Sequence, residues 1–269
     1  MIIRFFCLLI LTISVQLNVT AQRADNLPLR LRVCTYNVGH FNQGSLGGFQ
    51  GLRGHVQAEL LQWKYWIGKQ NLDILALNEW NTFFDKDSVY HAEEQLLKPF
   101  YKNAYFGKTN KWIYNGIVTN YNLTNIRQVK WDGDYYAILG DLPIGDKVIT
   151  VISTHIPWQK GKHENSLQAL IDELRKYEYF ICMGDMNAGD QNQLKFVEAG
   201  FNMANGGHLG WFSTAAAAVM KSGRKGEPNT NIDNIVTSPN IKIFNVSAPR
   251  TGLNDLDHLP ILADLVITW

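Results

Sequence analysis

The chain has 269 residues, of which 46% are hydrophobic and 18% are charged, so it can bury a sizeable core. Its formal net charge of +1 excludes the distinctly basic class of nucleic-acid-binding domain. Any contact with a polyanion must therefore be local.

Residues 1–21 have the pattern of a secretory signal peptide. Arg4 supplies the positive start, residues 5–15 form an apolar run that is too short to span a bilayer, and small residues precede a cleavage site after Ala21. We expect an exported protein, periplasmic or secreted, that keeps no integral membrane segment after cleavage. The alternative is an uncleaved membrane anchor. Residues 22–30 would then form a polar leader.

The first half of the chain alternates between strand and helix patterns. A strand at 31–36 precedes a glycine-rich loop that lacks the Gly-Lys-Ser/Thr ending of a P-loop. The helical spacing of apolar residues predicts a helix at 52–69. A short apolar strand is predicted at 73–77 and ends at Asn78-Glu79. Residues 87–97 are expected to form another helix. Four strands are predicted next, at 112–119, 124–131, 135–141 and 146–154, with turns at Gly133 and Gly145.

The second half continues this alternation. We predict helices at 163–177 and 190–199 around a strand at 179–183, and final strands at 232–237, 241–246 and 260–267. The long segment 202–230 lacks a clear pattern and carries Trp211, Phe212 and a basic patch of Lys221, Arg224 and Lys225. The two aromatic residues could stack on a base, enter lipid or cover a core edge. Without repeats or linker-like composition, residues 31–269 are expected to form one domain.

Two cysteines, Cys34 and Cys182, follow the signal peptide, and both lie in apolar strand-like runs. Export would permit a disulfide between them. We favour the simpler interpretation that both are small buried hydrophobic residues.

Polar residues follow several of the predicted strands. The groups are Asn37, Asn78-Glu79, Thr154-His155, Asp185-Met186-Asn187 and Asp257-His258, and Asp233 lies inside the predicted strand 232–236. A buried acid within a strand is costly unless it is paired. Each group alone is consistent with a turn or a cap, but sites are commonly assembled from several strand ends. Together they indicate a functional site.

In this order, the motifs resemble those of the endonuclease/exonuclease/phosphatase superfamily, which includes DNase I, AP endonucleases, neutral sphingomyelinases and inositol polyphosphate 5-phosphatases. The matching segments are Thr35-Tyr36-Asn37, Leu77-Asn78-Glu79, Ser153-Thr154-His155, Gly184-Asp185-Met186-Asn187, Asn231-Ile232-Asp233 and Asp257-His258-Leu259-Pro260. Departures from the family pattern are Asn78 for Gln, Asn231 and Asn234 for Arg and Tyr, and Leu256 for Ser. They bear on substrate subgroup, because no catalytic residue type is lost.

The resemblance implies an α/β fold of the DNase I-like kind, a four-layer α/β/β/α sandwich of two packed β-sheets flanked by helices. Glu79 is the expected main ligand of a Mg²⁺ ion, with Asp257 as a second ligand and with Mn²⁺ or Ca²⁺ as alternatives. Asn37 would position Glu79 or the phosphate, and Asn115, within a strand, would touch phosphate.

The same resemblance implies the catalytic groups. His258 would contact the phosphate or handle the proton, and Asp233 would orient its ring and favour the imidazolium. His155 would donate to a phosphoryl oxygen. Asp185 would orient or deprotonate the attacking water, which Asn187 would hold. Which residue is the general base stays open between the Asp and a His.

We therefore expect an exported, Mg²⁺-dependent phosphodiester hydrolase, monomeric and nuclease-like. One alternative is a phospholipid or sphingomyelin phosphodiesterase, or another phosphoesterase of the same fold. The other is a catalytically silent binding module. Both enzymatic hypotheses imply a phosphodiester substrate, which would be a nucleic acid or a phospholipid.

Overall fold

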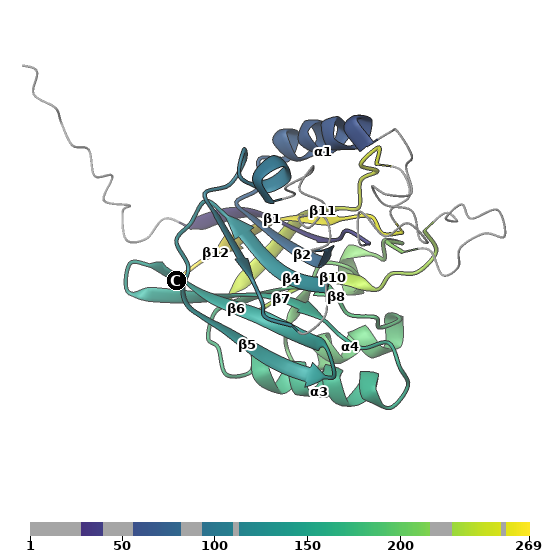
Figure 1. The fold of residues 1–269 in the computed structure, drawn as a ribbon. Helices are drawn as coiled ribbons and strands as arrows, with labels where there is room; N and C mark the ends of the chain where they lie inside the picture. Colours follow the sequence, from purple (N-terminus) through teal and green to yellow (C-terminus); the bar gives the residue numbers. More distant parts are fainter. Residues whose placement is uncertain (1–27, 40–55, 82–92, 110–112, 216–227, 254–256) are drawn as a thin grey trace, which may run out of the picture.

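The computed structural model describes residues 28–39, 56–81, 93–109, 113–215, 228–253 and 257–269. The predicted signal peptide, most of the leader and of the glycine-rich loop, and the basic patch of Lys221, Arg224 and Lys225 lie outside these ranges. The described residues form two six-stranded sheets, each with parallel and antiparallel pairs (Figure 1).

The first sheet has the strand order β11-β12-β1-β2-β4-β3. Its strands are β11 (Ile241–Ser247), β12 (Ile261–Ile267), β1 (Leu29–Asn37), β2 (Ile74–Asn81), β4 (Ile113–Thr119) and β3 (Asn103–Phe106). β1 pairs with β2 in parallel and with β12 antiparallel. The sheet therefore joins both ends of the domain at its centre.

The second sheet has the order β5-β6-β7-β8-β10-β9. Its strands are β5 (Thr124–Asp132), β6 (Tyr135–Ile144), β7 (Lys147–His155), β8 (Phe180–Asp185), β10 (Asp233–Thr237) and β9 (Asn202–Met203). β7 and β8 are parallel, and the connection between them contains helix α3 (Lys162–Leu174). The carboxyl ends of β7 and β8 therefore lie together at one edge.

Helices cover the outer faces of the two sheets (Figure 1). Helix α1 (Val56–Gln70) and the π-helical turn η1 (Glu93–Leu97) pack on the first sheet through Trp63 and Leu96, while α3 and α4 (Asp190–Glu198) pack on the second through Leu167 and Phe196. A short 3₁₀ turn, η2 (Gly207–Leu209), lies within the long segment that follows α4. The predicted four-layer α/β/β/α sandwich is confirmed.

A third apolar cluster lies between the sheets and holds them together. Alternate residues of β1, such as Leu31 and Val33, meet residues of the second sheet such as Val151 and Ile181. Period-two alternation sends neighbouring residues to opposite faces of a strand, so one strand serves two clusters. This explains why the central strands read as continuous apolar runs in the sequence.

Several element boundaries differ from the sequence prediction. β1 begins at Leu29, inside the predicted leader, and β2 continues past Glu79 to Asn81. Asp233 is the first residue of β10 instead of an interior one, although its side chain is fully buried as expected. Strands β3 and β9 were not predicted, because four and two residues give too little periodicity.

The cysteines lie on opposite outer faces, Cys34 under α1 and Cys182 under α3, and both are free and buried. The alternative of a disulfide is therefore wrong. Burial raises the pKa of both thiols, which keeps them in the neutral form. Within the described ranges, no helix is long and apolar enough to cross a bilayer.

Candidate active site

Strand register brings the predicted polar residues to one end of the sandwich. In the first sheet Asn37 stands opposite Asn78, and in the second sheet Asp185 stands between His155 on one side and Asp233 on the other. Because β1, β2, β7 and β8 all end here, side chains from strands far apart in the chain become neighbours. The prediction that these groups form one cluster is confirmed for these residues.

Buried amides join the two sheets at this end. Asn37 Nδ2 donates to Asp185 Oδ2 across the interface at 3.0 Å, and the Asp185 backbone N–H donates to Asn78 Oδ1 at 3.0 Å. Asn78 Nδ2 in turn donates to the carbonyl oxygen of Thr154 at 2.9 Å. Both asparagines are fully buried, so these bonds satisfy groups that would otherwise be costly to bury. They fix the position of β8 relative to β1 and β2.

Gly184 is required by the close approach of β7. A Cβ atom at this position would lie 1.9 Å from the carbonyl oxygen of Thr154, and the residue has φ of 155°. Only glycine adopts this backbone conformation without a steric penalty. The glycine before Asp185 therefore lets β8 approach β7 closely enough to place the carboxylate beside His155.

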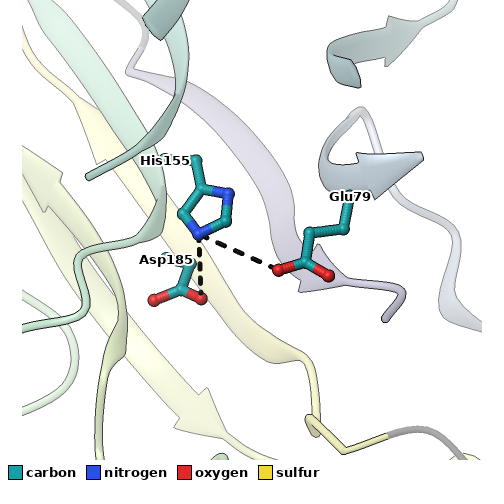
Figure 2. A group of neighbouring side chains, drawn as sticks. All are labelled: Glu79, His155 and Asp185. Carbon is teal, nitrogen blue, oxygen red and sulfur yellow. Dashed lines mark ion pairs between the residues drawn. The ribbon is translucent and has the colours of Figure 1, made fainter. Parts of the chain in front are cut away.

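A bulge in β2 directs Glu79 into the site. The register with β4 shifts between Leu77 and Trp80, and Glu79 has φ of 55°. Bulges of this kind turn a side chain away from its regular direction. Glu79 Oε1 lies 3.9 Å from His155 Nε2, which in turn is 3.5 Å from Asp185 Oδ2 (Figure 2).

His258 and Asp233 form a buried pair on the other side of Asp185. His258 Nδ1 lies 2.8 Å from Asp233 Oδ2, and His258 Nε2 lies 3.8 Å from Asp185 Oδ2. Burial lowers the pKa of His258, but the carboxylates of Asp233, Asp185 and Asp257 outweigh it and raise the pKa to about 10. The ring is therefore an imidazolium at neutral pH, as the sequence analysis expected.

Asp185 is the centre of the cluster and is almost fully buried. Burial, together with the neighbouring Asp233, raises its pKa to about 6 against the opposing influence of His155, His258 and the Asn187 backbone N–H. A carboxylate with a pKa near neutrality can take up a proton in the physiological range. The position is suited to the predicted task of deprotonating a water.

Asn187 reaches back from the turn after β8 to His155. The residue has φ of 44°, its backbone N–H donates to Asp185 Oδ1 at 2.8 Å, and its Nδ2 donates to the Ile156 carbonyl oxygen at 2.8 Å. The same Nδ2 lies 3.1 Å from His155 Nε2. Since a carbonyl oxygen can only accept, the amide orientation is fixed and Asn187 presents a donor to the ring.

Asn37, Asn115 and Asp257 also belong to this end of the molecule. Asn115 is buried, donates to the Tyr136 carbonyl oxygen at 2.7 Å and accepts from Asn78 at 3.0 Å. Asn37 contacts Asp185, and its Oδ1 accepts the N–H of Gly39. Their predicted contacts with phosphate stay predictions; the structure adds that both asparagines position other members of the site.

Asp257 packs against Gly39. A Cβ at Gly39 would lie 2.4 Å from Asp257 Oδ1, so this glycine leaves room for the carboxylate. Gly39 is bonded to Asn37, and Asp257 directly precedes His258. The expected second metal ligand thus lies on the side of the site nearest to β1.

The donor atoms fit a hard divalent cation. Ligand atoms of Glu79, His155 and Asp185 lie within 4.8 Å of one another, and so do those of Asp185, Asp233 and His258. Carboxylate oxygens from Glu79 and Asp185 suit Mg²⁺, which binds proteins through one or two carboxylates. The second group is already paired internally through His258 and Asp233. The first group, at the expected ligand Glu79, is the better cation site.

The aromatic residues singled out in the long segment after α4 do not contribute to this cluster. Phe212 packs against the core between the sheets, and the ring of Trp211 lies over Gly206. Of the alternatives for these two residues, the structure favours covering a core edge. The sequence analysis placed Asn78 among the polar strand-end residues and noted it as a departure from the family pattern, but its bridging role could not be predicted from the sequence.

Comparison with known proteins agrees with this arrangement. The Endonuclease/Exonuclease/phosphatase family profile matches residues 34–258. The crystal structure of an endonuclease/exonuclease/phosphatase from Bacteroides vulgatus is 16% identical in sequence and matches with a TM-score of 0.66. The match covers 89% of this chain and 99% of the Bacteroides vulgatus chain. ANGEL2, a 2′,3′-cyclic phosphatase crystallised with adenosine-2′,3′-vanadate, is 14% identical in sequence and matches with a TM-score of 0.63. The match covers 89% of this chain and 96% of the ANGEL2 chain.

The catalytic domain of human Nocturnin, crystallised with a sulfate anion, is 17% identical with a TM-score of 0.59, over 89% of this chain and 94% of that domain. Identities this low show a shared fold. No curated protein sequence matches the chain.

Proposed function

Because the chain belongs to the Endonuclease/Exonuclease/phosphatase family and has its phosphoesterase fold, we propose that it is a Mg²⁺-dependent hydrolase of phosphodiester bonds in nucleic acid. The observation that carries the proposal is the position of Asp185. Its Oδ2 atom lies within 4 Å of both His155 Nε2 and His258 Nε2, at 3.5 and 3.8 Å. One potential base thus stands between two imidazole rings.

Each chemical requirement of phosphodiester hydrolysis has a candidate here. Asp185, with its raised pKa, accepts the proton of the attacking water. His258, held as the cation by Asp233, stabilises charge on the phosphate or donates a proton to the leaving oxygen. Asn187 holds the water or donates to the phosphate. These roles follow the sequence prediction and remain proposals.

Glu79 would hold the cation, with Asp185 or Asp257 as further oxygen ligands. A bound Mg²⁺ supplies Lewis-acid stabilisation of negative charge on the phosphoryl group. The bulge at Glu79 points its carboxylate toward His155 and Asp185, which supports this assignment.

Nucleic acid is the preferred substrate class because of one structural relative. ANGEL2, a 2′,3′-cyclic phosphatase that shares this fold, was crystallised with adenosine-2′,3′-vanadate, which supports a substrate that carries a nucleoside. We further propose that the mature protein is exported, on the basis of the N-terminal sequence pattern, and that it acts as a monomer.

A substrate screen tests the proposed function. Purified mature protein with Mg²⁺ would be given plasmid DNA, RNA, sphingomyelin vesicles and bis(4-nitrophenyl) phosphate, with EDTA as the metal-free arm. We expect cleavage of a nucleic acid, loss of activity in EDTA and recovery on addition of Mg²⁺. Cleavage of sphingomyelin alone would overturn the nucleic-acid assignment, and no turnover with Mg²⁺, Mn²⁺ or Ca²⁺ would favour a binding module.

Asp185→Asn provides the matched inactive variant. We expect it to lower kcat at least about a hundredfold, the scale of a positioned acid–base group. Asp172→Asn makes the same change on an exposed position of α3 and should leave kcat unchanged.

A further inference from the structure

The backbone at His258 is held by a segment that lies far from it in the chain. His258 precedes β12 and belongs to neither six-stranded sheet. Instead it forms an isolated antiparallel bridge with Ala215, and the N–H of the next residue, Leu259, donates to the Thr214 carbonyl oxygen at 2.6 Å. The long segment after α4, which has no clear pattern in the sequence, therefore fixes the backbone that carries this imidazole ring.

The same segment contacts Asp233, the partner of His258. Thr214 Oγ1 accepts the backbone N–H of Asp233 at 3.3 Å, and both residues are fully buried. We call residues 212–215 the bridging segment, because they are bonded to the strand of Asp233 and to the backbone beside His258. The last residue of the segment also pairs with Thr230. The separation of the acid from the imidazole thus depends on where the bridging segment lies.

Asn205 fixes the first residue of the bridging segment. The Phe212 backbone N–H donates to Asn205 Oδ1 at 2.7 Å, and Asn205 Nδ2 donates to the Phe212 carbonyl oxygen at 3.0 Å. The same Nδ2 donates to the carbonyl oxygen of Asp233 at 2.9 Å. An asparagine amide has two N–H donors and one accepting oxygen, so each of these groups is used. The side chain of Asn205 therefore joins the bridging segment directly to Asp233.

Asn205 is itself held on both sides of its backbone by Asn234. Asn234 Oδ1 accepts the Asn205 N–H at 2.8 Å, and Asn234 Nδ2 donates to the Asn205 carbonyl oxygen at 2.9 Å. Both asparagines are fully buried. Asn234 directly follows Asp233 in β10 and is one of the departures from the family pattern. A buried amide network in which each of these groups is bonded specifies one geometry, and this network ends at the His258–Asp233 pair.

Resting on the proposed hydrolase function, we propose that Asn205 is a positioning residue, which holds His258 against Asp233 through the bridging segment. It acts through these residues and not by contact with the substrate. A misplacement of about 1 Å at a reacting group can cost about a hundredfold in rate. Loss of the Asn205 amide should therefore slow the chemical step more than it weakens substrate binding.

Steady-state kinetics of Asn205→Ala test this role. The small substrate bis(4-nitrophenyl) phosphate, with Mg²⁺, reports on the reacting groups without the contacts of a long substrate. We expect kcat to fall roughly ten- to a hundredfold and KM to change less than about twofold. Circular dichroism shows whether the variant folds, and a thermal melt gives its Tm. A wild-type kcat in folded Asn205→Ala would overturn the proposal.

Asn202→Ala is the matched control for a purely structural role. Asn202 also lies in β9 and its Nδ2 donates to the Ile241 carbonyl oxygen at 2.8 Å, but it stands opposite Thr237, at the end of β10 away from Asp233. We expect this variant to lose Tm and to keep its kcat. An equal loss of kcat in both variants at the same Tm would show that Asn205 serves stability alone.

Proton NMR of the metal-free protein gives a readout that does not depend on turnover. The Nδ1 proton of His258, bonded to Asp233, would be assigned by its absence in His258→Gln. We expect its resonance to shift or broaden in Asn205→Ala and to stay in place in Asn202→Ala. An unchanged resonance in Asn205→Ala would overturn the inference. If the wild-type protein hydrolyses none of the substrates, the proposed function fails, yet this resonance still decides the role of Asn205.

Asn205→Asp is the second variant, for use if Asn205→Ala does not fold. It keeps the shape of the side chain and the oxygen that accepts from Phe212, but it replaces the amide that donates to Phe212 and Asp233. We expect the His258 resonance to move and kcat to fall at least about tenfold, with KM nearly unchanged. Wild-type values for both in folded Asn205→Asp would overturn the proposal.

Discussion

The two imidazoles of the site differ in their second polar partner. His258 and His155 both direct Nε2 toward Asp185 Oδ2, at 3.8 and 3.5 Å. On the β10 side the second partner is a carboxylate, Asp233, and on the β7 side it is the amide of Asn187. The same ring chemistry, placed on either side of one acid, is thereby given two different tasks.

His258 is held in its charged form. A carboxylate at Nδ1 requires a proton on that nitrogen, and the raised pKa keeps a proton on Nε2 as well. The ring therefore presents a fixed donor and a fixed positive charge to whatever occupies the site.

His155 has a donor amide as well as two carboxylates beside its Nε2 atom. Asn187 can only donate to Nε2, because its amide also donates to Ile156, so this bond exists when Nε2 carries no proton. A protonated Nε2 would instead face the carboxylates of Asp185 and Glu79 (Figure 2). The comparison teaches that the second polar partner gives each ring its character, since a carboxylate accepts from Nδ1 of His258 and an amide donates to Nε2 of His155.

The largest effect should come from removing the charged ring. His258→Ala eliminates the fixed donor, and we expect kcat to fall at least about a hundredfold. Steady-state kinetics with Mg²⁺ measures this, and circular dichroism shows whether the variant folds. His208→Ala removes an exposed histidine and should not change kcat. A wild-type rate in both His258→Ala and His258→Gln would exclude this ring from the mechanism.

Removing the carboxylate behind the ring should have a smaller effect that depends on pH. In Asp233→Asn the pKa of His258 should fall from about 10 toward or below its ordinary value of 6.5, because burial alone lowers it. We expect kcat to fall about ten- to a hundredfold at pH 8 and less at pH 6. A pH–rate profile measures this shift of the alkaline limb to lower pH. An alkaline limb at the wild-type position would contradict the assignment of the cation to His258.

Removing the amide that donates to His155 Nε2 should have a moderate effect. Asn187→Ala deletes one positioned donor, and we expect kcat to fall about tenfold, equivalent to one hydrogen bond. Nitrogen NMR of the neutral His155 ring should find its proton on Nδ1 in the wild-type protein and a shift toward Nε2 in the variant. Asn122→Ala, an exposed asparagine in the β4–β5 turn, is the control. The same tautomer in both proteins would show that Asn187 does not set it.

The smallest effect should appear in stability. The raised pKa of His258 means that its charge stabilises the folded state fully below pH 6.5, and that this contribution is lost as the pH rises to about 10. In metal-free protein, the Tm difference between wild type and Asp233→Asn should be a few degrees at pH 6 and should shrink toward pH 10. Thermal melts in EDTA measure it. A difference that grows with pH would have the wrong sign for a stabilising imidazolium.

Much of the site could be predicted because the sequence marks where strands end. Asn37, His155 and Asp185 each close an apolar run, and all three meet at one edge. Glu79 does not end its strand; it is turned inward by a bulge, which a single strand does not reveal. The sequence did not predict that Asn78 positions Asp185, because the two residues belong to different strands.

By itself, the sequence determined the order of most elements and the identity of the polar cluster, and the resemblance of its motifs to a known family implied the fold class. The element order and the cluster follow from local patterns, namely the period of apolar residues and the polar residues where that period stops. Only the tertiary structure decided which side chains meet. The register of β7, β8 and β10 sets Asp185 between two histidines, and the packing of the sheets separates Cys34 from Cys182. Contacts of this kind depend on the relative placement of distant strands, which no local pattern encodes.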